Sequence, residues 1–232
     1  MRFLALFRKE MREAAPWLVL AAVATLLLGG GAVRSKIAEA QSLPRAYWPR
    51  EPGGRVFPFD LLQSSGLQDC GPVVLLAAAG LGLALAVTQF LMPGLLQTWP
   101  FTLHRSASPL SILLAKAAAT ATALCLGVGA VWTGLFLWAS RPEALRYRPD
   151  VAVLAEGWLM VATGMVVYFG AAASAQSPAR WYTTRTLPLF AATGIVVLAF
   201  VATSIPGFAA AMLVGVAILA PQVLHLFLNG EH

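Results

Sequence analysis

The sequence predicts an all-α membrane protein with six transmembrane helices and an interfacial amphipathic helix before the first of them. Hydrophobic residues make up 59% of the 232 residues and charged residues only 11%, and the apolar residues occur in blocks too long for a globular core. A helix needs about 20 mostly apolar residues to cross a hydrocarbon layer about 30 Å thick. Long runs of Ala, Leu, Gly and Val without strand-like alternation favour helices over a β-barrel.

Six stretches are long and apolar enough to form these helices. They run approximately over residues 17–33, 72–96, 111–139, 151–173, 187–204 and 207–228. The third is the longest, and such a helix tilts or projects beyond the bilayer. Together they predict one transmembrane domain over residues 1–232.

Residues 1–15 predict an amphipathic helix in the inner headgroup plane. At 100° per residue, one face is apolar and carries Phe3, Leu4, Phe7, Met11 and Ala14. The other face is charged and carries Arg2, Arg8, Lys9, Arg12 and Glu13. Pro16 then marks the expected turn into the first span. The alternatives are a solvated N-terminus and a signal peptide, but Arg34 and Lys36 separate the apolar block from its cleavage-like Ala-Glu-Ala triplet.

Charge alone does not decide the orientation. With the N-terminus inside, eight basic residues lie in the inner segments and eight in the outer ones. The four basic residues directly before the first span favour a cytoplasmic N-terminus, because the first helix usually dominates. Six spans then place both termini in the cytoplasm and the chain in the plasma or bacterial inner membrane. The large outer loop, residues 34–71, is predicted to be a connector or, alternatively, a substrate-gating lid.

Few polar residues lie within the predicted spans. Glu156 is the charged one, near the outer end of the fourth span, where it is solvated at the interface or takes part in a proton relay. Lys116 and His225 lie near the inner boundary and are expected to snorkel toward water. Gln89 and Gln222 are expected to form hydrogen bonds between helices.

Small residues recur every fourth position in two spans. They include Ala117, Ala121 and Gly129 in the third span and Gly207, Ala211 and Gly215 in the sixth. Such stripes let helix backbones approach closely, so they predict packing within the bundle or between two copies, in preference to a substrate path.

No catalytic or cofactor motif is present in the sequence. None of the three lysines follows a glycine, the three histidines lack metal-ligand spacing, and there is no GxSxG elbow. We therefore expect no enzyme activity, cofactor or metal in this chain, and no nucleic-acid partner. Energy for uphill transport would come from a partner or an ion gradient.

The break between the second and third spans, residues 97–110, contains a Trp99-Pro-Phe101 step followed by His104 and Arg105. With the N-terminus inside, this break is cytoplasmic and short. Ser108 and Pro109 are suited to start the next helix as its cap and first residue. The break is interpreted as a protrusion that a cytosolic protein binds, or as an ordinary loop with an interfacial tryptophan.

This stretch resembles the intracellular coupling segment of type-2 ABC exporter permeases. The matching residues, in comparable order, are Thr98, Phe101, Leu103, Ser108, Ile112, Leu113, Leu114, Ala115 and Lys116. The sequence LFRKEMRE, residues 6–13, similarly resembles the amphipathic elbow helix of that family. Six spans and cytoplasmic termini agree with the family architecture.

The resemblance implies a permease subunit that works with a second copy or a homologue and with two cytosolic ATPase subunits. ATP and magnesium would bind to those partners, whose closure would drive alternating access. The residues implied in docking are Trp99, Phe101, His104 and Arg105, with Phe7 and Arg8 in the elbow beside them. Two alternatives remain, a haem-exporter-B-like permease for cytochrome assembly and a membrane anchor or scaffold without transport. The sequence does not identify the substrate.

Overall fold

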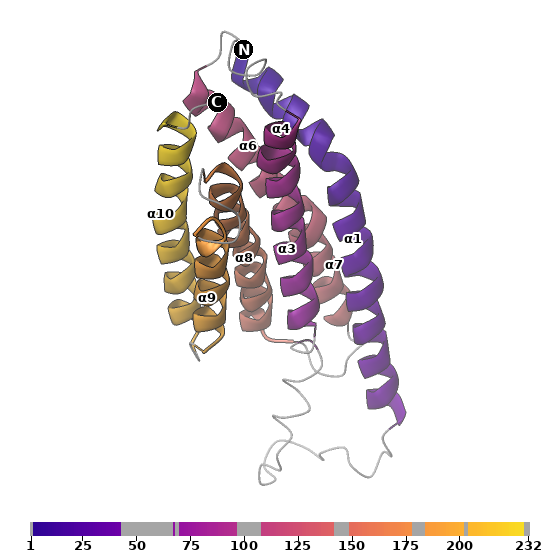
Figure 1. The fold of residues 1–232 in the computed structure, drawn as a ribbon. Helices are drawn as coiled ribbons and strands as arrows, with labels where there is room; N and C mark the ends of the chain where they lie inside the picture. The colour runs from indigo at the N-terminus through magenta and orange to yellow at the C-terminus, as the bar shows by residue number, and fades with distance from the viewer. Residues whose placement is uncertain are drawn as a thin grey trace.

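The structure is a computed structural model that describes residues 2–42, 67, 70–96, 108–141, 149–177, 184–201 and 204–229. Its helical elements are α1 (Arg2–Ser42), α3 (Gly71–Ala86), η2 (Val87–Leu91), α4 (Met92–Leu95), α6 (Pro109–Leu124), η3 (Cys125–Gly129), α7 (Ala130–Ala139), α8 (Val151–Gln176), α9 (Leu187–Val201) and α10 (Ile205–Asn229). Figure 1 shows these elements as a bundle of roughly parallel and antiparallel columns, with α6 and α7 behind α3. The start of α1 and the end of α10 lie at the same end of the bundle (Figure 1).

Within these ranges, five helical columns are long and apolar enough to cross a membrane. They are Phe3–Ser35, Gly71–Leu95, Pro109–Ala139, Val151–Gln176 and Ile205–Asn229. They contain five of the six predicted spans, so the described residues fit an all-α, multi-pass membrane protein. Helix α9 occupies the position of the remaining predicted span. Its 15 residues rise about 22 Å, which is less than the roughly 30 Å of a hydrocarbon layer.

The chain before α9 folds back onto the end of α8. Arg185 donates two hydrogen bonds, from Nε to the Ser174 carbonyl and from Nη2 to the Ala175 carbonyl, both at 3.1 Å. The Ser174 hydroxyl in turn accepts from the Leu189 backbone N–H at 3.1 Å. A cation at a helix C-terminus and a hydroxyl at a helix N-terminus both satisfy backbone groups that helix ends leave unpaired. These contacts fasten α8 to α9.

Helix α1 is continuous through Pro16, so the predicted turn there is not a break in the helix. Its first turns run obliquely across the end of the bundle, and the rest runs along the side (Figure 1). A proline inside a helix produces such a change of direction. At its other end α1 extends to Ser42, into the predicted outer loop, because residues 36–41 include strong helix formers and the next proline after Pro16 is Pro44. Most of that loop lies outside the described residues.

Helices α3 and α8 approach so closely that their backbones touch. A Cβ added to Gly82 on α3 would collide with the Gly164 carbonyl on α8. A Cβ added to Gly164 would lie only 2.7 Å from the Ala78 carbonyl. Glycine is therefore required on both sides of this contact, which we call the glycine contact. In membranes, close packing of small residues replaces the hydrophobic effect as the force that joins helices.

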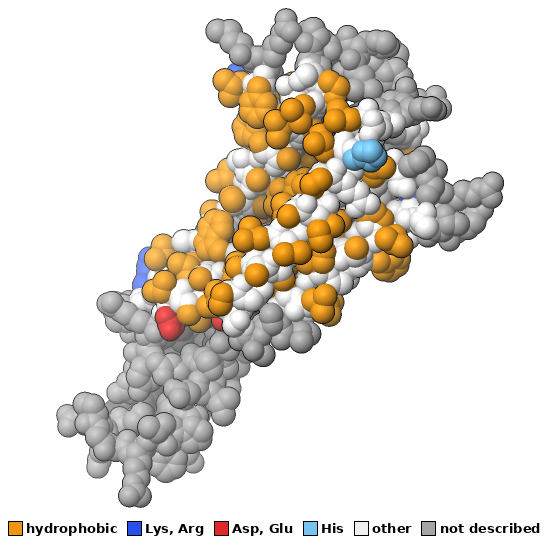
Figure 2. All heavy atoms as spheres, turned by 90° about the vertical axis from the view of Figure 1, so that its left-hand side faces the viewer, with side chains coloured by type: hydrophobic (Ala, Val, Ile, Leu, Met, Phe, Trp, Pro, Cys, Tyr) orange, Lys and Arg blue, Asp and Glu red, His pale blue; other side chains and the backbone are white. Residues whose placement is uncertain are grey.

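The outward faces of the bundle carry large apolar side chains. Figure 2 shows that the face over α9 and α10 is mostly hydrophobic. Phe190 on α9 and Leu213 on α10 are each 72% exposed, and Leu27 on α1 is 68% exposed. Exposed apolar surface on this scale marks an interaction surface in a protein, and hydrocarbon chains are the solvent that matches it.

Candidate functional site

The predicted docking residues of the coupling segment, Trp99, Phe101, His104 and Arg105, lie outside the described residues. The structure does describe the end of that segment. The Ser108 hydroxyl accepts from the Ser111 backbone N–H at 3.3 Å and caps α6, and Pro109 is the first helical residue. The predicted start of this helix is confirmed, because serine followed by proline satisfies the free N–H groups and fixes the backbone angle.

The two predicted elbow residues, Phe7 and Arg8, lie in the first turns of α1. Phe7 is half-buried and stacks on Phe3, with ring centroids 6.5 Å apart and ring planes inclined by 18°. Arg8 is exposed. The orientation of these residues agrees with the predicted two-faced pattern, but the helix that carries them is continuous with the first span.

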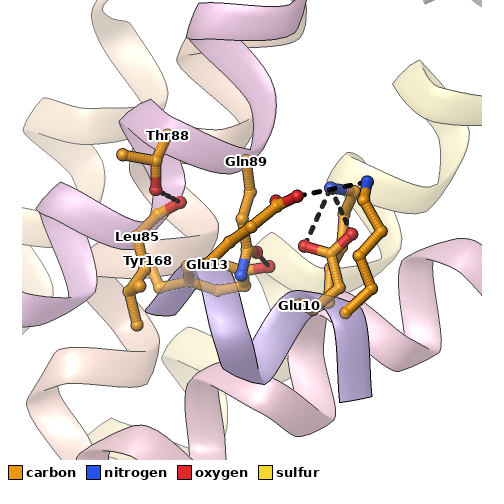
Figure 3. Close-up of polar contacts among 8 residues, drawn as sticks. Glu10, Glu13, Leu85, Thr88, Gln89 and Tyr168 are labelled. Atoms are coloured by element: carbon orange, nitrogen blue, oxygen red, sulfur yellow. Dashed lines mark hydrogen bonds and ion pairs between the residues drawn. The ribbon is translucent and has the colours of Figure 1, made fainter. Parts of the chain in front are cut away.

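A buried ion pair joins α1 to α6. The Lys116 ammonium donates to both Glu10 carboxylate oxygens, at 3.1 and 3.2 Å. Figure 3 shows both oxygens turned toward the ammonium. The two side chains are only 6% and 4% exposed, respectively. The expectation that Lys116 snorkels toward water is therefore wrong, since a carboxylate within the bundle holds its charge.

An aromatic group lies against this ion pair. The Lys116 ammonium is 5.6 Å from the centroid of the Phe90 ring, a distance at which a cation is attracted to an aromatic face. Phe90, from η2, is tilted against Tyr168 of α8 at 6.0 Å and meets Phe227 of α10 edge-on at 6.5 Å. Side chains from α1, α6, η2, α8 and α10 thus meet at one end of the bundle.

A buried hydrogen bond lies next to these rings. The Tyr168 hydroxyl donates to Gln89 Oε1 at 2.7 Å, which confirms the prediction that Gln89 bonds between helices. Gln89 Nε2 and the Thr120 hydroxyl, both buried, have no hydrogen-bond partner within the described part of the chain. An unpaired buried polar group destabilises a protein by about 1–3 kcal/mol. Contacts among the described residues therefore do not satisfy this group of residues. We call Glu10, Gln89, Lys116, Thr120 and Tyr168 the polar cluster.

Gln89 and Phe90 lie on a π-helical turn, η2. The Thr88 hydroxyl donates to the carbonyls of Ala84 and Leu85, at 3.0 and 3.1 Å, and so competes with the backbone ladder at this point. Figure 3 shows the bond to Leu85. Single π-helical turns inside α-helices occur frequently at functional sites. This one turns two side chains of the second span toward the ion pair.

The predicted small-residue stripes lie at different kinds of contact. Gly129 is buried beneath Trp158, where an added Cβ would come within 2.6 Å of the ring. A Cβ added to Gly215 would lie 3.2 Å from the Val166 side chain and 3.0 Å from the Ile195 side chain. The remaining members are half-buried, namely Ala117, Ala121, Gly207 and Ala211. The backbone contact between Gly82 and Gly164 lies outside both stripes.

The sequence analysis did not predict the ion pair between Glu10 and Lys116. The sequence indicates only one of its two partners, Glu10. Glu10 falls on the apolar face of α1, at helical spacing with Phe3, Phe7 and Ala14. A carboxylate on the face that packs against a bundle requires a buried partner. Lys116 carries no such signal, because its distance from the end of the third span suits an interfacial lysine equally well.

The described residues contain no group of three or more His, Cys, Asp or Glu side chains that could hold a metal ion. What they define is an all-α, multi-pass membrane protein in which the polar cluster lies toward the end where α1 starts. No protein-family model matches the chain, and no curated protein or solved structure is significantly similar to it.

Proposed function

We propose that this chain is the transmembrane permease subunit of an ABC exporter. In this proposal it moves a substrate by alternating access, and ATP hydrolysis in a separate nucleotide-binding subunit drives the movement. The observation that carries the proposal is the buried pair between Glu10 and Lys116. Glu10 belongs to the segment that resembles an elbow helix, and Lys116 belongs to the end of the segment that resembles a coupling segment.

The positions of these residues suit the transmission of force. Residues 97–107 connect α4 to α6, so a push on them acts on two helices at once. The first turn of α6 is fixed by its Ser108 cap, and Lys116, about two turns further along, links α6 to α1 and touches Phe90 of η2. A partner that moves the segment would therefore move three columns together, which is the rigid-body motion that alternating access needs.

The proposal includes the assembly and its orientation. Two copies, or one copy and a homologue, would pair with two cytosolic ATPase subunits that carry ATP and magnesium. The start of α1 and the end of α10 lie at one end of the bundle, together with the polar cluster (Figure 1). We assign that end to the cytoplasm and the exposed apolar faces to the lipid of a plasma or inner membrane.

The proposal is tested by purifying the tagged chain from its native cells in mild detergent and asking whether an ATPase with a Walker motif copurifies. We expect wild type to retain this ATPase and Arg105→Glu to lose about ten-fold or more of it, because a reversed charge in a docking surface repels its partner. Arg141→Glu is the matched control, since Arg141 is exposed at the end of α7, away from the polar cluster.

The amount of each variant in the membrane is measured in parallel, so that loss of the partner is not confused with loss of the chain. Copurification of haem-handling proteins, or of no ATPase at all, would contradict the proposal and favour the alternatives. Retention of the ATPase by Arg105→Glu would contradict the assigned docking residues.

A further inference from the structure

A recess of about 190 Å³ lies at the opposite end of the bundle from the polar cluster. It is formed where α8 begins, α9 ends and α10 begins, and its lining includes Glu156, Met160, Phe200 and Phe208. In Figure 2 the acidic side chains on the apolar face, in red, lie at the lower end, where α8 begins in Figure 1.

Glu156 gives this recess a specific chemistry. Its side chain is half-buried in a membrane-spanning helix, and within the part of the chain that the structure describes it forms no hydrogen bond or ion pair. Acidic groups at membrane depth are rare, destabilising and typical of ligand or ion sites. A carboxylate in an apolar recess attracts cations, and it favours those that are weakly hydrated and therefore lose their water at low cost.

The aromatic residues fit the same kind of ligand. The Phe200 and Phe208 rings lie 5.5 Å apart between centroids and are inclined by 77°, so they present a face and an edge at a right-angled corner. Aromatic faces attract ammonium groups, most strongly the poorly hydrated quaternary ones. Leu159 and Met160 supply apolar lining beside them.

We propose that this recess binds a monovalent organic cation with a small apolar body, such as a quaternary ammonium compound. The positive group lies between the Glu156 carboxylate and the aromatic rings, and the apolar body contacts Leu159 and Met160. The size is appropriate, because an apolar cavity of about 150 Å³ in another protein accommodates benzene. This binding site goes beyond the proposed transport function and does not depend on the partner ATPase.

The test uses the purified full-length chain in nanodiscs and two probes of nearly identical shape. Benzyltrimethylammonium carries the positive charge, and neopentylbenzene replaces its nitrogen with carbon. By titration calorimetry against empty nanodiscs, we expect the cation to bind at least about ten-fold more tightly than the neutral compound. Glu156→Gln, which keeps the shape and removes the charge, should abolish this preference.

Glu13→Gln is the matched control, because it makes the same change of charge at a 54% exposed position on α1, at the other end of the bundle. It should bind the cation as wild type does. Should Glu156→Gln fail to fold, Phe200→Leu provides a second variant, with an expected loss of several-fold in affinity for the cation only.

Equal binding of the two probes, wild-type affinity in Glu156→Gln, or an equal loss in Glu13→Gln would each overturn the proposal. Because no ATPase is present, failure here leaves the proposed transport function untouched. Conversely, the transport proposal fails if no ATPase copurifies with the chain. Cation binding by the purified chain would still support this site in that case.

Discussion

The glycine contact and the polar cluster join helices by opposite means. At the glycine contact, α3 and α8 meet through backbone atoms, and neither Gly82 nor Gly164 brings a side chain. At the polar cluster, α1, α6, α8 and η2 meet through charged and hydrogen-bonding side chains. The first contact has one close-packed arrangement, whereas the second contains groups that could exchange partners.

The difference shows that the polar cluster does not exist for stability alone. Replacing a buried ion pair by apolar residues of similar volume is often neutral or stabilising in other proteins. The cluster also leaves Gln89 Nε2 and the Thr120 hydroxyl without a partner in the described part of the chain. We infer that the pair of Glu10 and Lys116 fixes the register of α1 against α6, a role for which buried polar groups are known.

The largest effect is expected at the ion pair. Lys116→Met keeps the length of the side chain but leaves the Glu10 carboxylate buried without a counter-charge, which should lower the unfolding free energy by about 3–5 kcal/mol. Reversible unfolding in mixed detergent micelles measures this change. Lys9→Met is the control, because Lys9 and Glu13 form a 3.4 Å pair that is 46% and 54% exposed. Such surface pairs contribute about 0–1 kcal/mol.

The double variant separates loss of the pair from loss of packing. Glu10→Met combined with Lys116→Met removes both charges, so most of the lost stability should return. A double variant as unstable as Lys116→Met alone would contradict the view that an uncompensated carboxylate causes the loss. Stability recovered without recovery of ATPase copurification would support a role of the pair in register or coupling.

A smaller effect is expected at the glycine contact. Gly82→Ala places a Cβ against the Gly164 carbonyl and must separate α3 from α8, so it should destabilise the protein by about 1–3 kcal/mol. Gly80→Ala is a closely matched control. Gly80 lies on the same helix, and a Cβ added there meets nothing within 4 Å. It should be neutral or slightly stabilising because alanine is the better helix former. Equal melting temperatures for the two variants would show that the helices are not in backbone contact.

Hydropathy predicted most of the fold because a helix must be long and apolar to cross a membrane. It could not predict that Arg185 and Ser174 would join the end of α8 to the start of α9, because these contacts form only when the two helices are assembled. It could not predict continuity through Pro16 either, because a proline can kink a helix as well as end it. The π-helical turn at η2 has no sequence signal that we recognise.

The site was harder to predict than the fold, for a physical reason. Small residues recur in several spans, and the sequence does not show which stripe faces another helix. Gly82 and Gly164 bring two helix backbones into contact, although neither belongs to the stripes that the spacing emphasised. The partner of a buried charge is fixed only when the helices are assembled. The position of Glu10 on the apolar face of α1 could indicate a buried carboxylate, but the sequence could not identify Lys116 as its partner.

The smallest expected effect concerns the hydrogen bond within the polar cluster. Tyr168→Phe removes the donor to Gln89 Oε1 but keeps the ring against Phe90, so it should lower the unfolding free energy by about 0.5–1.5 kcal/mol. Gln89→Leu and the double variant complete a thermodynamic cycle, whose interaction energy should be of similar size. Thr88→Val is the control, since its hydroxyl bonds only to carbonyls of its own helix. If the cycle gives no interaction energy, the two side chains are not partners in the membrane.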